Sequence, residues 1–445
     1  MDTGLEAQKV KERARSSLWF VPAAIMLLAA IAAVGLAQVP TQPGSLLAHI
    51  GWSGDVNGAR TLLQLLASSV ITVTSLTFSL ALVAMQLAAS NFSPRLLRTF
   101  VRKPVFQVTL GVFLATFVYC LLVLRRLTAT TPVPHVAMLG ALLLAIASVA
   151  ALVWFLARIL TELRVEAMMS DARAEAMHVL KRTFPEVAEG SPDADLPEPG
   201  EKAVPVRARR SGFVQAVDPA LIRTWAAQRD LVIRIDVCVG ERVVTGLPCG
   251  WVWPREPTNA STIDPNEVSR AIFDGLEVGF ERTPQQDLGF GFRQLTDIVV
   301  KAMSPAINDP TTAAHAIGHL AELLCALARH SLGPHLARDS GGVLRVAVAG
   351  RVFDDFLDLA CAQPRRFGGG EPAIVAALLE LLRDVALVVD GEPRRNSVRR
   401  QIDLVVRAAE RQIPEERDLE PVYPLAATAR HALTDPNVTP RYTSA

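Results

Sequence analysis

The stretch from Thr61 to Ser90 constrains this chain more than any other, because it is apolar enough to enter a bilayer and contains no charged residue. As a helix rising about 1.5 Å per residue it would span about 45 Å, which exceeds the roughly 30 Å hydrocarbon core of a bilayer. The sequence therefore predicts a membrane helix that tilts or projects beyond the bilayer.

Eight of the polar residues in this stretch form a regular pattern. They recur at steps of three and four residues from Thr61 to Ser90, with Val83 filling the one gap. At about 100° per residue they fall within one narrow stripe on the helix surface, which we call the polar stripe. Its six pore-lining candidates are Gln64, Ser68, Thr72, Ser75, Ser79 and Gln86.

Two interpretations of the polar stripe remain open. Lipid cannot satisfy hydroxyls and amides, so the stripe should face protein or water. Small polar residues allow helices to pack closely, which favours a helix–helix interface. A water-lined pore or substrate path is the alternative. Gln64 and Gln86 favour it slightly, because Gln bonds back to its own helix less easily than Ser or Thr does.

Three further stretches are apolar over about the length that a bilayer requires. They run over residues 18–37, 105–124 and 136–157. A secretory signal peptide is the alternative for the first, but its apolar region of about 7–15 residues would be shorter. We expect a four-span transmembrane domain over residues 18–157, in which residues 61–90 form the second span.

The charges flanking these spans predict their orientation. The N-terminal segment 1–17 carries four Lys or Arg residues, and the loop between the second and third spans carries four more. The other two loops contain only Arg60, and Arg125 with Arg126. The positive-inside rule therefore places both termini in the cytoplasm of a multi-pass inner-membrane protein.

Composition agrees with a membrane part joined to a cytosolic part. Half of the residues are hydrophobic, one fifth are charged and the net charge is +1, so there is no global basic signature for nucleic acid. The five cysteines are far apart and form no CxxC pair. A disulfide framework or structural zinc site is not expected, and the second part is predicted to be cytosolic.

The remainder is expected to be an α+β region. We predict a helical stalk and linker over 158–203, a small β-rich module over 204–262, a mainly helical domain over 263–412 and a C-terminal tail over 413–445. Within the helical domain, the pattern predicts helices at 265–274, 285–303, 310–331, 353–362, 372–389 and 395–412, and a strand at 343–352. The β-module has no lysine at its turn to carry a prosthetic group, and no cofactor is expected.

Two cytosolic segments are dense in polar residues. The first runs over 279–287 and the second over 304–312. In the second, Asp309 is a natural N-cap with Pro310 at the first helical position, and the same helix end would attract an anion. Capping and turn geometry are the plainer interpretation there. For the first segment the plainer interpretation is a structural Arg–Asp network.

Catalytic and metal motifs are not apparent. His315 and His319 have metal-ligand spacing, but no Glu base stands between them, and a packed or solvated helix face is the plainer interpretation. The sequence contains no GxSxG, P-loop or dinucleotide fingerprint. We therefore expect neither an enzyme nor a metal site.

Three segments together resemble one bacterial family. They are SLTFSLALVAMQLAASNFSPRLLRTF, GFERTPQQD with LGFGFRQLTDI, and KAMSPAINDPTTA. The sequence is similar here to the predicted membrane proteins known as domain of unknown function family twenty-two fifty-four. The resemblance spans about residues 15–410 and implies four N-terminal spans and a large cytosolic part, but no activity. The signature positions that it implies are Arg282, Thr283, Gln286, Asp287, Ser304, Asn308, Asp309 and Pro310.

Two functions of different classes follow. The first is a homo-oligomeric ion channel or transporter for a small ion or solute, in which the polar stripes line the path and the cytosolic part regulates it. The second is a membrane-anchored sensor or scaffold whose cytosolic part binds a ligand or partner. In both, the bilayer is the expected partner.

Overall fold

The computed structural model describes residues 19–39, 54–91, 104–127, 133–162, 164–186, 195–200, 202–256 and 264–435. The chain divides into an N-terminal unit, Met1–Met168, and a C-terminal unit, Met169–Ala445. The basic loop residues between the second and third expected spans lie outside the described residues.

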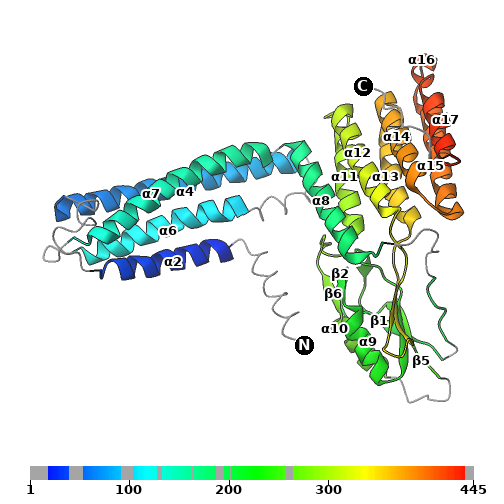
Figure 1. The fold of residues 1–445 in the computed structure, drawn as a ribbon, viewed down its shortest axis with the longest axis horizontal. Helices are drawn as coiled ribbons and strands as arrows, with labels where there is room; N and C mark the ends of the chain where they lie inside the picture. Colours follow the sequence, from blue (N-terminus) through cyan, green and yellow to red (C-terminus); the bar gives the residue numbers. More distant parts are fainter. Residues whose placement is uncertain are drawn as a thin grey trace. The chain divides into compact units, whose positions relative to one another are not determined.

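The N-terminal unit consists of helices that lie side by side (Figure 1). They are α2 (Phe20–Leu36), α4 (Val56–Asn91), α6 (Pro104–Arg126) and α7 (His135–Glu162). Helix α6 contacts each of the other three. Small residues permit this close packing, since Ala33, Ala59, Ala115 and Ala141 are all buried in one cluster around Tyr119.

Three of these helices are long and apolar enough to cross a membrane. The matching segments are Val56–Gln86, Val105–Arg126 and His135–Ile159. Helix α2 is apolar but has only 17 residues, so the expected set of four spans is not confirmed. The chain is thus mostly helical, with three candidate membrane helices and a smaller sheet region.

The C-terminal unit contains two sheets. The first has the order β1-β5-β3-β8-β7, and all its pairs are antiparallel except β3 with β8. The second has the order β4-β2-β6 and is antiparallel. The strands are β1 (Val204–Arg207), β2 (Gly212–Val217), β3 (Leu231–Ile235), β4 (Arg242–Val243), β5 (Pro248–Pro254), β6 (Leu276–Gly279), β7 (His335–Arg338) and β8 (Leu344–Val348).

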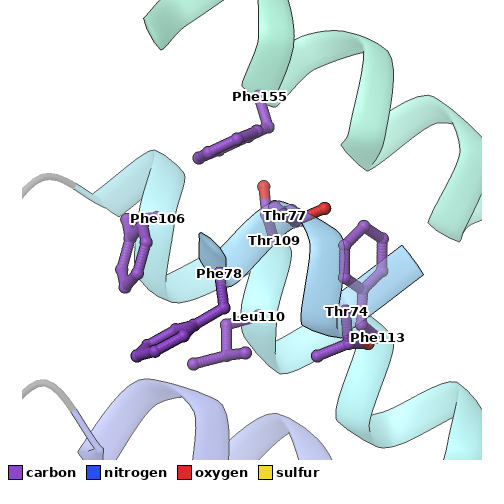
Figure 2. A pocket seen from close by; sticks show the side chains of 8 residues that line it. All are labelled: Thr74, Thr77, Phe78, Phe106, Thr109, Leu110, Phe113 and Phe155. Atoms are coloured by element: carbon purple, nitrogen blue, oxygen red, sulfur yellow. The ribbon is translucent and has the colours of Figure 1, made fainter. Parts of the chain in front are cut away.

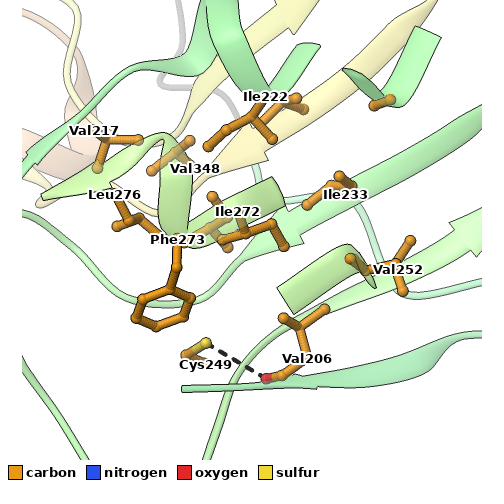
Figure 3. Close-up of a cluster of buried hydrophobic side chains, with 14 of the residues drawn as sticks. Val206, Val217, Ile222, Ile233, Cys249, Val252, Ile272, Phe273, Leu276 and Val348 are labelled. Atoms are coloured by element: carbon orange, nitrogen blue, oxygen red, sulfur yellow. Dashed lines mark hydrogen bonds between the residues drawn. The ribbon is translucent and has the colours of Figure 1, made fainter. Parts of the chain in front are cut away.

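A single apolar core joins both sheets to the two helices beside them. These helices are α9 (Pro219–Gln228) and α10 (Pro265–Asp274). Ile222 and Ile272 from the helices meet Ile233 and Val252 from the first sheet and Leu276 from the second (Figure 3). The Cys249 thiol donates to the Val206 carbonyl oxygen at 3.5 Å within the same core.

The remaining helices of this unit stand side by side (Figure 1). They are α8 (Val165–Thr183), α11 (Leu288–Ala302), α12 (Pro310–Leu327), α13 (Phe353–Gly368), α14 (Pro372–Val388), α15 (Glu392–Gln412), α16 (Glu416–Leu419) and α17 (Val422–Ala432). Helix α8 packs closely on α11 at Gly291: a Cβ added to this glycine of α11 would lie only 3.4 Å from the Cα of Ala176 on α8.

Asp–Pro pairs start three helices of this unit. Asp218, Asp264 and Asp309 each cap a helix whose next residue is proline. The Asp side chain accepts a hydrogen bond from a free backbone N–H, while Pro supplies a preset helical φ where no N–H is needed. The sequence predicted this Asp–Pro helix start at Asp309.

The structure differs from several expected boundaries. Strand β8 pairs with β3, and the unexpected β7 pairs with β8, so the expected module 204–262 is part of a larger sheet. Helix α13 continues to Gly368 with Pro364 inside it. The segment expected as a tail contains α16 and α17, and Ala426 and Ala429 of α17 are buried. Within the expected stalk and linker 158–203, α7 extends to Glu162 and α8 begins at Val165.

Candidate functional site

The polar stripe lies on the exposed side of α4. All six candidates, Gln64, Ser68, Thr72, Ser75, Ser79 and Gln86, are exposed in the described unit. The residues of α4 that pack on α6 and α7 include Leu63, Ala67, Val70 and Thr77, which are buried. At about 100° per residue this buried face points away from the stripe, on the other side of the helix. Nothing within the described unit covers the stripe.

Three hydroxyls of the stripe donate to backbone carbonyls of their own helix. Thr61 Oγ1 donates to the Asn57 carbonyl oxygen at 2.9 Å, and Thr72 Oγ1 to that of Ser68 at the same distance. Ser68 Oγ donates to the Leu65 carbonyl at 3.1 Å. Each of these oxygens retains acceptor capacity, so the stripe presents an uncharged, hydrogen-bonding surface.

A separate hollow lies among α4, α6 and α7 (Figure 2). Its walls carry Phe78, Phe106 and Phe155, with the Phe106 and Phe155 ring centres 6.4 Å apart. Thr77 lies there with 8% of its surface exposed, and its hydroxyl has no hydrogen-bond partner among the described residues. None of the six stripe candidates lines the hollow. The sequence analysis did not select Thr77, because this residue lies on the opposite side of α4 from the polar stripe.

The first polar signature forms a buried ion pair at the start of α11. Arg282 Nε donates to Asp287 Oδ2 at 2.7 Å, and Arg282 Nη2 is equally close to that oxygen. Asp287 is 3% exposed, and its other oxygen accepts from the Phe290 backbone N–H at 3.1 Å. Burial raises the pKa of the Asp287 carboxyl, while the guanidiniums of Arg282 and Arg351 act in the opposite direction.

Gly240 and Arg351, which the sequence analysis did not select as site residues, complete this cluster. A Cβ on Gly289 would lie 3.4 Å from Arg351 Nε and 3.5 Å from Arg282 Nη2, so both guanidiniums reach one point beside α11. Gly240 faces the pair from the β3–β4 loop, where a Cβ would lie 2.7 Å from Asp287 Cγ. Only the tertiary fold brings residues 240, 287 and 351 together. In the sequence, the only local indication was that Gly240 lies in a predicted turn.

Gln286 attaches the same segment to the second sheet. Its Oε1 accepts from the Val217 N–H at 3.0 Å, and its Nε2 donates to the Val217 carbonyl at 3.3 Å. From the facing strand, Gln215 Nε2 donates to the Glu281 carbonyl at 2.6 Å. Thr283 Oγ1 is buried without a partner among the described residues. Arg282, Gln286 and Asp287 therefore fix the β6–α11 connection.

The second signature forms the turn between α11 and α12. Asp309 Oδ1 accepts from the Thr312 N–H at 3.1 Å, and Oδ2 from the Thr312 hydroxyl at 2.6 Å. Asn308 has a positive φ of 49°, a conformation that Asn tolerates better than most residues. Hydrogen bonds from Thr312 lower the pKa of Asp309. Ser304 donates to the Lys301 carbonyl at 2.7 Å and closes the preceding helix.

The two signatures do not form one site. Asp287 caps the start of α11, and Ser304 follows its end, so a helix of 15 residues separates them. At about 1.5 Å per residue this is a separation of about 22 Å. His319, on α12, lies 3.5 Å from Glu322, which also pairs with Arg173 at 3.0 Å. In the part of the chain that the structure describes, no group of three or more His, Cys, Asp or Glu residues is placed to hold a metal ion.

Comparison with known proteins gives the family. Residues 15–384 match the family described as "Predicted membrane protein (DUF2254)". The chain belongs to this family. The match includes the membrane helices and both signature segments, as the sequence resemblance had indicated.

Relatives in the family extend over nearly the whole chain. The uncharacterized proteins Rv1290c of Mycobacterium tuberculosis and Mb1321c of Mycobacterium bovis are each 34% identical over 427 residues. This covers 95% of the chain and 82% of each relative. No solved structure matches. The family description assigns membrane location and no activity, so activity has to be argued from the site.

The cysteines of the C-terminal unit should react slowly in this family member. Burial raises the pKa of Cys249 to about 11 and that of Cys238, Cys325 and Cys361 to about 12. At pH 8 the thiolate is then scarce, and we expect modification at least about a hundredfold slower than for a free thiol. The rate should rise with pH toward these values.

Timed labelling of the folded full chain with a thiol reagent, read by mass spectrometry, measures these rates. A Leu247→Cys variant is the control, because Leu247 is 56% exposed and a thiol there should react at an ordinary rate. Equal rates for the native cysteines and this control would contradict the prediction.

Proposed function

We propose that this chain is the subunit of a homo-oligomeric channel or transporter for a small ion or solute, in which the polar stripes of several α4 helices line the path. The observation that carries the proposal is the exposure of all six stripe candidates on the side of α4 that no other described helix covers. Lipid is a poor environment for such a surface.

The packing within one subunit supports a path between subunits. The core of the four helices is occupied by Ala33, Ala59 and Ala115 together with Tyr119, whose hydroxyl donates to the Ala137 carbonyl at 2.9 Å. A ring of copies would place the stripes against one another or around water. Hydroxyls and amides without fixed charge suit weak, multi-site contacts that let a solute leave as readily as it enters.

The proposal includes α2 as a fourth span. Helix α2 packs along α6, where a Cβ on Gly111 would lie 3.2 Å from the Pro22 Cα. Its 17 residues give about 25 Å, short of the hydrocarbon core by a margin that local thinning accommodates. Four spans and the positive-inside rule place both termini in the cytoplasm and the protein in the inner membrane.

Flux through liposomes that contain the purified chain tests the proposal. We expect Ser75→Leu and Ser79→Leu to abolish flux, because each puts a large apolar side chain on the stripe. Ser69→Leu is the matched control, since Ser69 is also exposed but lies about 120° around the helix from Ser75. Cross-linking of the same samples should show an unchanged assembly.

The outcomes separate the two functions. Loss of flux in the two stripe variants alone supports a path lined by the stripe. Loss of the assembly in those variants means that the stripe is a packing interface instead. Absence of flux from the intact wild-type assembly, over a range of ions, solutes and pH, would contradict transport and favour a membrane-anchored sensor or scaffold.

A further inference from the structure

Two adjacent turns of the C-terminal unit form a continuous surface. One turn covers residues 207–211 between β1 and β2, and the other covers 242–247 from β4 to β5. Ala208 N–H donates to the Leu247 carbonyl at 2.9 Å, and Gly246 N–H donates to the Ala208 carbonyl at 2.8 Å. We call this surface the turn pair. Its shape is fixed by backbone bonds and does not depend on a ligand.

The turn pair has a concentrated positive charge. Arg207, Arg209, Arg210 and Arg242 are all exposed on it. Arg207 Nη1 donates to the Gly246 carbonyl at 2.8 Å, and Arg210 Nη2 to that of Leu276 at 3.3 Å. Carbonyls orient these guanidiniums but do not neutralise them. Within the described residues, none of the four arginines forms an ion pair.

The two nearby carboxylates, Glu241 and Glu277, do not neutralise the arginines of the turn pair. Glu241 is turned to the Cys238 backbone N–H, from which its Oε2 accepts at 3.0 Å. Glu277 is exposed on β6 next to Leu276, but it forms no ion pair with Arg210 among the described residues. The whole chain carries a net charge of only +1, so the positive charge of the turn pair is a local excess that overall composition does not explain.

Aliphatic side chains accompany the arginines. Leu247 is 56% exposed and Val244 is 37% exposed. Arg242 and Val244 are two residues apart on either side of the buried Val243, so they project from the same face. A surface with cationic groups around exposed aliphatic residues is typical of segments that lie at the headgroup level of a membrane.

We propose that the turn pair docks on anionic phospholipid headgroups, with its arginines on the phosphates and Leu247 and Val244 entering the interfacial layer. Guanidinium groups match phosphate oxygens in a bidentate manner. The same chain contains membrane-spanning helices, so this surface meets lipid at a high effective concentration and weak contacts suffice. A single-stranded nucleic acid would instead require aromatic stacking platforms, whereas these side chains are aliphatic. The inference depends on membrane embedding and not on transport.

A reporter at Leu247 tests docking in the full chain. Leu247→Cys is labelled with an environment-sensitive fluorophore, and the protein is reconstituted in phosphatidylcholine vesicles with or without phosphatidylglycerol. We expect a blue shift, and quenching by headgroup-proximal spin-labelled lipid, only with phosphatidylglycerol. Raising the salt to about 0.5 M should reverse both effects, because screening shortens the range of the attraction.

Charge reversal provides the matched comparison. Arg209→Glu with Arg210→Glu should weaken docking about tenfold or more. Arg407→Glu with Arg411→Glu, an exposed pair on α15, should leave it unchanged. A second reporter at Tyr423→Cys, a site that is 50% exposed on α17, should show no dependence on phosphatidylglycerol.

Three results would overturn the proposal. The first is a Leu247 signal that is identical with and without phosphatidylglycerol. The second is a signal that persists after reversal of Arg209 and Arg210 in a protein with unchanged circular dichroism. The third is a signal that follows the protein-to-lipid ratio instead of the lipid charge, which would identify a second copy of the chain as the occupant.

Discussion

Replacing Asp287 with alanine is expected to destabilise the C-terminal unit by about 3–5 kcal/mol, because the change leaves the buried guanidinium of Arg282 without its partner. Arg282 and Asp287 side chains are 15% and 2% exposed, so water cannot take the place of the carboxylate. The same change removes the N-cap that accepts the Phe290 N–H. Urea unfolding of the full chain, followed by fluorescence of Trp251 and Trp253 on β5, measures the effect.

Asp309→Ala is the matched control, because Asp309 is also a helix N-cap but is more exposed and has no arginine partner. Its loss should destabilise by only about 1 kcal/mol. Replacing both members of the buried pair with apolar residues, as in Arg282→Met with Asp287→Leu, should recover much of the stability. Equal effects of Asp287→Ala and Asp309→Ala would contradict a buried structural pair.

Gly240→Ala is expected to destabilise the same unit by about 2–4 kcal/mol, since two effects add. Gly240 has a φ of +87°, which a side chain makes unfavourable. Its new Cβ would also lie 2.7 Å from Asp287 Cγ and 2.9 Å from Arg282 Nη2, within the volume of the ion pair. Urea unfolding of the full chain again measures the loss.

Gly246→Ala separates the two effects. Gly246 has nearly the same φ, +83°, but no atom lies within 4 Å of its would-be Cβ. Gly246→Ala should therefore lower the free energy of unfolding only through the unfavourable positive φ, by about 1 kcal/mol. The difference between the two variants measures the steric contact with the ion pair. If both variants lose the same stability, Gly240 does not contact the pair in solution.

Local sequence patterns account for the helices and their ends. An uncharged 61–90 segment can only be a long helix in a bilayer, and α4 runs from Val56 to Asn91. Asp309 followed by Pro310 marks the start of α12, because capping depends on neighbouring residues alone. The spacing of polar residues also determined which side of α4 they share, since helical geometry fixes that side whatever surrounds the helix.

Contacts between distant segments were not predictable in this way. The pairing of β3 with β8 joins Ile233 to Val346 across more than a hundred residues, and no local pattern specifies it. The Arg282–Asp287 pair lies within one loop, but its burial depends on Gly240 and Arg351 from other elements. Helix α17 escaped prediction because its burial against α14 outweighs a proline-broken sequence.

The sequence by itself determined membrane helices, the polar stripe and the capped starts of helices, because these depend on periodicity and on residues a few positions apart. Only the tertiary structure decided that the stripe faces away from its own bundle, that Gly240 and Arg351 approach the Arg282–Asp287 pair, and that Arg207, Arg209, Arg210 and Arg242 share one surface. Each of these depends on which surfaces pack together. Packing is settled by the burial of whole faces at once, and no single segment encodes it.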